Sequence, residues 1–200
     1  RAFSPSTKPM NKLVAEFIGP FFLVQAVGYA AVTDSPHAAL VIGLTLMVMV
    51  YAGGHISGAH YNPAVTLAVW LRGKLPKAEV LPYIAAQIAG AAVSALVVTK
   101  FRGLGSEAVL SSPLRVAGAE FLGTFALAWV VLNVATAKGT AGNSFYGAAI
   151  GMTVTAGIFL FGGISGAVFN PAVAVAGGVL NLLPLKTVAL YTIVCAAAAF

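Results

Sequence analysis

The sequence predicts an all-α membrane protein built as an inverted repeat, each half holding three spans and one re-entrant half-helix. Hydrophobic residues make up 60% of the chain and charged residues only 8%, whereas about a quarter of the residues of soluble domains are charged. Several apolar segments reach the length that a bilayer requires. A block also recurs, as Ile-Ser-Gly-Ala-His-Tyr-Asn-Pro-Ala-Val at 56–65 and Ile-Ser-Gly-Ala-Val-Phe-Asn-Pro-Ala-Val at 164–173.

The first half of the chain is expected to open with a polar tail, residues 1–11, and to form the first repeat over residues 12–100. This repeat holds spans at 12–32, 38–52 and 78–98, with a half-helix at 62–71 between the second and third. Residues 72–77 form a basic loop. At about 1.5 Å per residue the half-helix is too short to cross a hydrocarbon core of roughly 30 Å.

The second half repeats this order after a connecting loop at 101–113. The second repeat, residues 114–200, holds spans at 114–135 and 145–161, a half-helix at 170–180 and a sixth span that opens at Lys186. The sixth segment is too short to cross the bilayer. We therefore expect the sixth span to be truncated in this sequence.

Each half-helix starts at an Asn-Pro-Ala motif, at residues 62–64 and 170–172. Asn is a preferred N-cap, Pro suits the first helical position, and Ala continues the helix. The glycine-rich segments before the motifs, 52–55 and 161–163, are expected to be non-helical backbone at membrane depth, which survives only where protein or a cavity surrounds it.

A second repeated motif supports the inversion. Ala-Glu-Phe occurs at 15–17 and again at 119–121, an offset similar to that of the Asn-Pro-Ala motifs. Because three spans is an odd number, the second copy enters the membrane in the opposite orientation. Lys and Arg are more numerous on the side of the N-terminus, which predicts a cytoplasmic N-terminus.

Several function classes are disfavoured by composition. The net charge of +6 comes from short loops between apolar segments, which indicates membrane topology rather than nucleic-acid binding. No nucleophile–base pair, phosphate-binding loop or cofactor motif is present, so an enzyme is not expected. His55 and His60 have no carboxylate or Cys at ligand spacing, so no metal is expected either.

With these motifs the chain resembles the aquaporin family, the major intrinsic proteins, over about residues 10–200. The resemblance implies six spans, two half-helices that meet midway, a pore in each subunit and a homotetramer in the lipid bilayer. It places Asn62, Pro63, Ala64, Asn170, Pro171 and Ala172 at the pore, where the two asparagines donate hydrogen bonds to passing solutes. Opposed helix N-termini repel cations and interrupt proton wires.

The chain departs from the usual family pattern at one position. The second motif is usually followed by an arginine of the selectivity filter, and here Val173 follows it, as in the plant vacuolar branch. The other filter positions fall on Ile42, Ile158 and Ala167, so the predicted filter is apolar. This pattern favours water and small uncharged solutes, with urea, ammonia or glycerol as candidates, over strict water selectivity.

Polar residues inside the spans need a structural or functional reason. By resemblance Glu16 and Glu120 accept hydrogen bonds from the re-entrant loops, a role we prefer to proton transport, and His60 supports the loop rather than gating it. Gly28, Gly90, Gly118, Gly123, Gly147, Gly151 and Gly157 are expected to allow close helix packing. We predict a passive channel. The alternative is an accessory membrane subunit of the same fold that conducts poorly, because an apolar filter can dewet.

Overall fold

A computed structural model describes residues 8–200, so the predicted tail lies mostly outside the described residues. The described chain is helical, in the order α1 (Pro9–Val32), α2 (Ala38–Ser57), α3 (Pro63–Leu71), α4 (Lys77–Arg102), α5 (Pro113–Val131), α6 (Tyr146–Ser165), α7 (Pro171–Val179) and α8 (Leu185–Ala197). A π-helical turn, Leu132–Thr136, continues α5, and a 3₁₀ turn, Lys138–Thr140, follows it. Within residues 8–200, five helices are long and apolar enough to span a membrane, namely α1, α2, α4, α5 with its π turn, and α6.

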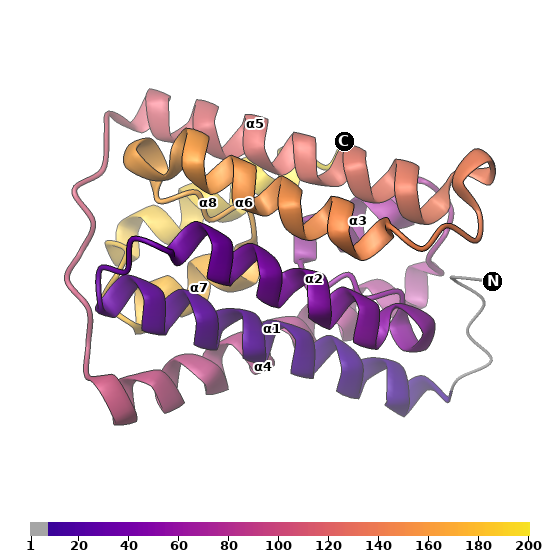
Figure 1. Ribbon diagram of the computed structural model, residues 1–200, viewed down its shortest axis with the longest axis horizontal. Coiled ribbons are helices and arrows are strands. Elements are labelled where there is room, and N and C mark those ends of the chain that lie inside the picture. The colour runs from indigo at the N-terminus through magenta and orange to yellow at the C-terminus, as the bar shows by residue number, and fades with distance from the viewer. Residues whose placement is uncertain (1–7) are drawn as a thin grey trace.

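The two halves run in opposite directions along the long axis of the molecule. In Figure 1 helix α1 begins at the right-hand end and α5 begins at the left-hand end. The short helix α3 lies toward the right and α7 toward the left. Helix α1 packs against α4, and α2 packs against α6. The segment between α4 and α5 connects the halves at the left-hand end.

The prediction of non-helical backbone at residues 52–55 and 161–163 is wrong. Helix α2 continues through these residues to Ser57, and α6 continues to Ser165. Each helix stops at a glycine in the left-handed conformation, Gly58 at φ 94° and Gly166 at φ 79°, which is the usual way to end a helix. The non-helical stretches are therefore the short segments 58–62 and 166–170.

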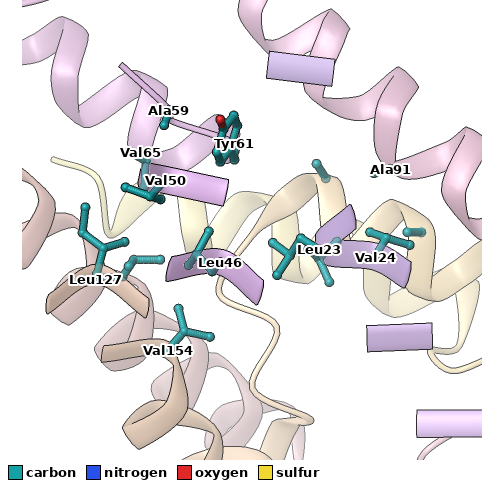
Figure 2. Packing of buried hydrophobic residues seen from close by; sticks show 14 of the residues in the cluster. Leu23, Val24, Leu46, Val50, Ala59, Tyr61, Val65, Ala91, Leu127 and Val154 are labelled. Carbon is teal, nitrogen blue, oxygen red and sulfur yellow. The ribbon is translucent and has the colours of Figure 1, made fainter. Parts of the chain in front are cut away.

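The core joins spans and half-helices rather than filling a separate layer. Figure 2 shows part of it, with labelled side chains Leu23 and Val24 from α1, Leu46 and Val50 from α2, Val65 from α3, Ala91 from α4, Leu127 from α5 and Val154 from α6. Ala59 and Tyr61 of the first re-entrant segment belong to the same cluster. The first re-entrant segment is thus packed against the spans and a half-helix, and irregular backbone persists at membrane depth where protein or a cavity surrounds it.

Most of the glycines that were expected at helix contacts lie there. A Cβ at Gly90 would meet the backbone of Phe17, and one at Gly151 would meet the backbone of Gly43. The prediction fails for Gly118, because a Cβ there would meet no atom of residues 8–200 within 4 Å. Gly118 lies on α5 beside buried residues without being in a contact itself, and spacing in an apolar helix does not separate these two situations.

Candidate functional site

The two half-helices meet at their N-termini in the interior of the protein. Asn62 caps α3 by accepting from the Ala64 amide at 2.8 Å, and Asn170 caps α7 by accepting from the Ala172 amide at 3.0 Å. Each asparagine also donates across the junction: Asn62 Nδ2 to the Phe169 carbonyl at 2.8 Å, and Asn170 Nδ2 to the Tyr61 carbonyl at 3.0 Å. Both Asn-Pro-Ala motifs, which also contain Pro63, Ala64, Pro171 and Ala172, are buried.

The re-entrant segments adopt the same strained backbone in both halves. Ala59 and Tyr61 have φ of 50° and 54°, and Ala167 and Phe169 have φ of 52° and 50°. Left-handed conformations cost non-glycine residues about 1 to 3 kcal/mol each and persist only where the surroundings impose them. The two buried glutamates are the main part of those surroundings.

Glu16 of α1 receives four hydrogen bonds. Its carboxylate accepts from the amides of His60 at 3.0 Å and Tyr61 at 2.8 Å. It also accepts from Ser57 Oγ at 2.6 Å and Gln87 Nε2 at 2.7 Å. The carboxylate is fully buried, so these donors take the place of water around its charge.

Glu120 of α5 makes the corresponding contacts in the second half. It accepts from the amides of Val168 at 3.0 Å and Phe169 at 2.7 Å, and from Ser165 Oγ at 2.6 Å. Its fourth neighbour is Cys195 Sγ at 3.8 Å, a weak donor. Both glutamates thus bond the backbone of a re-entrant segment from a spanning helix.

His60 adds a polar cluster that exists only in the first half. Its Nδ1 lies 3.2 Å from Thr66 Oγ1, and Gln87 Nε2 donates to the same hydroxyl at 2.9 Å. Thr66 Oγ1 donates in turn to the Asn62 carbonyl at 3.0 Å. Across residues 8–200, no group of three or more His, Cys, Asp or Glu is arranged to hold a metal ion.

Two cavities lie on either side of this cluster. One, of about 180 Å³, is lined by both asparagines and by the four predicted filter residues, Ile42, Ile158, Ala167 and Val173. The other, of about 540 Å³, opens among charged side chains that include Lys12, Lys74, Glu79 and Lys138. His60 and Val131 line both cavities, so they lie between the two.

The sequence analysis missed several residues that hold the site. The rings of Tyr61 and Phe169 fill the space that Gly19 and Gly123 leave open on α1 and α5. Tyr83 Oη donates to the Ser57 carbonyl at 2.8 Å, and Tyr191 Oη donates to the Ser165 carbonyl. The two tyrosines are separated by 108 residues, as Asn62 and Asn170 are. Applying that offset to every polar residue of the spans would have identified the pair.

Comparisons with known proteins agree with this geometry. The family model of the major intrinsic proteins matches residues 3–112 and again residues 106–200. The chain is 38% identical over 175 residues to the putative aquaporin NIP4-1 of Arabidopsis thaliana, which covers 81% of this chain and 62% of that protein. It is 41% identical over 176 residues to aquaporin NIP1-3 of Oryza sativa subsp. japonica, covering 81% of this chain and 61% of the relative.

The fold also matches a solved structure, the aquaglyceroporin from Plasmodium falciparum, with a TM-score of 0.77 and 22% identity. That match covers 96% of this chain and 91% of the other. The matched region amounts to about 62% of the length of the first curated relative. Two family matches that together cover nearly the whole chain, with relatives near 40% identity, show that this protein belongs to the major intrinsic protein family.

Proposed function

We propose that the protein is a passive transmembrane channel for water and small uncharged solutes, without enzymatic activity. The observation that carries this proposal is the meeting of two half-helix N-termini beside two cavities that share His60 and Val131. The conduit would run through both cavities, past Asn62 and Asn170. Each asparagine amide has two hydrogens and uses one across the junction, which leaves one for a solute.

The electrostatics of the junction favour neutral solutes. A helix N-terminus carries roughly half a positive charge, and two of them meet here. A cation at this point would be repelled by both and would lose its hydration in a mainly apolar cavity. Protons and metal cations are therefore excluded even though Val173 stands where a filter arginine is usual.

The apolar quartet Ile42, Ile158, Ala167 and Val173 sets the selectivity in this proposal. All four side chains line the smaller cavity and offer no hydrogen-bond donor. Urea, ammonia and glycerol are the candidate solutes besides water. We further propose a homotetramer in the bilayer with a cytoplasmic N-terminus.

Stopped-flow measurements on proteoliposomes test the proposal. We expect the protein to raise permeability to water and urea above that of empty liposomes, and to carry no proton or sodium current in planar bilayers. Ile158→Trp should block the conduit because the ring enters the smaller cavity. Leu81→Trp is the matched control, since Leu81 is 76% exposed on the outer surface of α4.

Two outcomes would contradict the channel. A folded protein that raises no permeability would favour the accessory subunit with a dewetted filter. Equal permeability in Ile158→Trp and Leu81→Trp would show that solutes do not pass through the smaller cavity. Proton current through the purified protein would overturn the exclusion argument.

A further inference from the structure

The hydrogen bonds around His60 determine which of its ring nitrogens can carry a proton. We propose that His60 is held as the neutral tautomer with hydrogen on Nδ1, so that Nε2 faces the conduit as a hydrogen-bond acceptor for permeating solutes. Gln87 and Thr66 are the positioning residues. The tautomer follows from the bonds alone, whereas the role toward solutes rests on the proposed channel.

The chain of hydrogen bonds that orients His60 starts at Glu16. Its carboxylate can only accept, so the group that Gln87 turns toward it, 2.7 Å away, is the amide nitrogen. The second hydrogen of the same nitrogen goes to Thr66 Oγ1 at 2.9 Å. This orientation leaves Gln87 Oε1 buried without a partner among residues 8–200. The two donated bonds therefore fix this side chain.

The hydrogen bonds of Thr66 determine which ring nitrogen of His60 carries the hydrogen. Its single hydroxyl hydrogen has an acceptor in the Asn62 carbonyl at 3.0 Å, while Gln87 occupies one of its two acceptor positions. The second acceptor position faces His60 Nδ1 at 3.2 Å. Hydrogen on Nδ1 therefore satisfies every contact of the hydroxyl. Hydrogen on Nε2 would force Thr66 to turn its hydroxyl from the Asn62 carbonyl to the ring, with the loss of one bond.

No described residue donates to His60 Nε2. His60 lines both cavities and Asn62 lines the smaller one, so the proposal places Nε2 where solutes would pass. In this proposal the two asparagines present donors to the conduit, and His60 presents an acceptor. Solutes that can both accept and donate, such as water and urea, match this order. The second half has Val168 at the corresponding position, so the acceptor occurs once.

Nitrogen NMR of protein labelled with ¹⁵N-histidine tests the tautomer directly. We expect His60 to show a pyrrole-like Nδ1 and a pyridine-like Nε2 at neutral pH. The His60→Asn variant identifies its signals among those of His37 and His55. A pyrrole-like Nε2 with a pyridine-like Nδ1, or an imidazolium, in the unmodified protein would overturn the proposal, and this readout needs no conductance.

The variants Thr66→Val and Thr66→Ser test the positioning. Thr66→Val should move His60 away from the Nδ1–H tautomer and lower urea permeability by about threefold, the effect of one ordinary net hydrogen bond. Thr66→Ser keeps the hydroxyl and should restore both readouts. Thr124→Val removes a buried hydroxyl that bonds Cys195 and should change neither.

The two proposals can fail separately. If urea permeability stays unchanged in a folded Thr66→Val protein whose tautomer has shifted, Nε2 does not contact solutes and that part of the proposal falls. If the unmodified protein does not conduct at all, the channel is wrong, while the spectrum still decides the tautomer.

Discussion

The two halves of the molecule hold their re-entrant segments with the same backbone bonds but different side chains. Ser57 and Ser165, and likewise Tyr83 and Tyr191, occupy equivalent positions and make equivalent bonds. Among the positions that differ, His60, Thr66 and Gln87 of the first half correspond to Val168, Ala174 and Cys195 of the second. Beyond the two amides and the serine that bond each glutamate, the first half therefore adds a polar cluster, and the second adds apolar groups and one thiol.

The difference separates scaffold from specialisation. In both halves two loop amides and one serine donate hydrogen bonds to the glutamate, so these bonds serve the strained backbone that both halves share. The His60, Thr66 and Gln87 cluster occurs once and reaches the junction of the two cavities. It is the part of the site that a scaffold role alone does not explain.

Removing a buried glutamate should have the largest effect on folding, and the effect should be larger in the first half than in the second. Each buried donor left without a partner costs about 1 to 3 kcal/mol, and Glu16→Ala abandons four strong donors where Glu120→Ala abandons three and a thiol. We expect both variants to reduce the yield of folded protein, Glu16→Ala more severely. The thermal midpoint measured by size-exclusion chromatography in detergent checks the order.

Glu107→Ala is the control, because Glu107 is exposed in the loop between α4 and α5. It should leave the midpoint unchanged. A greater loss in Glu120→Ala than in Glu16→Ala would mean that the fourth donor contributes nothing. Normal folding with lost permeability in either variant would replace the scaffold role with a direct part in transport.

Exchanging the fourth donor should have a smaller effect. Gln87→Cys gives the first half the thiol of the second and removes the two hydrogen bonds that Gln87 donates, to Glu16 and to Thr66. We expect a loss of about 1 to 3 kcal/mol of stability, seen as a lower thermal midpoint. Gln25→Met is the control, since Gln25 joins α1 to α4 through Ser94 without reaching a glutamate.

The reverse exchange tests the packing of the second half. Cys195 is fully buried beside Ala64, Ala68 and Ala128, so Cys195→Gln must fit a larger side chain into a filled space. Overpacking of this kind costs about 1 to 3 kcal/mol. If Gln87→Cys and Cys195→Gln were both neutral, the two halves would be interchangeable at this position.

Motif and hydropathy predicted the spans and the half-helices because each depends on local chemistry. The caps at Asn62 and Asn170 follow from neighbouring residues alone, and the observed half-helices start immediately after them. The Gly53–Gly54 and Gly162–Gly163 pairs led to the wrong prediction of non-helical backbone, because glycine has a low intrinsic helix propensity. Here α2 and α6 tolerate them, and at Gly53 the missing side chain makes room for the Tyr61 hydroxyl.

Long-range contacts were beyond the sequence for a different reason. The bond from Gln87 to Thr66 and the position of His60 between two cavities depend on how α4 packs against α1 and α3. A single sequence gives no distance between those helices. The internal repeat supplies part of this missing information. When the same residue type recurs 108 positions later, the same contact is expected in both halves.

Arginine at position 173 should alter selectivity without altering the fold. Val65 and Val173 are equivalent in the two halves, and both line the smaller cavity. In Val173→Arg a guanidinium would narrow the cavity and add up to five donors. We expect the ratio of urea to water permeability to fall about tenfold, which corresponds to about 1.4 kcal/mol of extra barrier for urea. An unchanged ratio in a folded, conducting protein would remove Val173 from the filter.

Mercurial reagents should have the smallest effect of all, because the thiol of the second half is not on the conduit. Cys195 is fully buried in a small cluster between α8, α3 and α5, and it lines neither cavity. We expect water permeability of the unmodified protein to be insensitive to mercury, measured by stopped-flow light scattering. Val173→Cys should create sensitivity that a thiol reductant reverses, since it places a sulfur in the smaller cavity. Inhibition of the unmodified protein that Cys195→Ser abolishes would instead place Cys195 on the solute path.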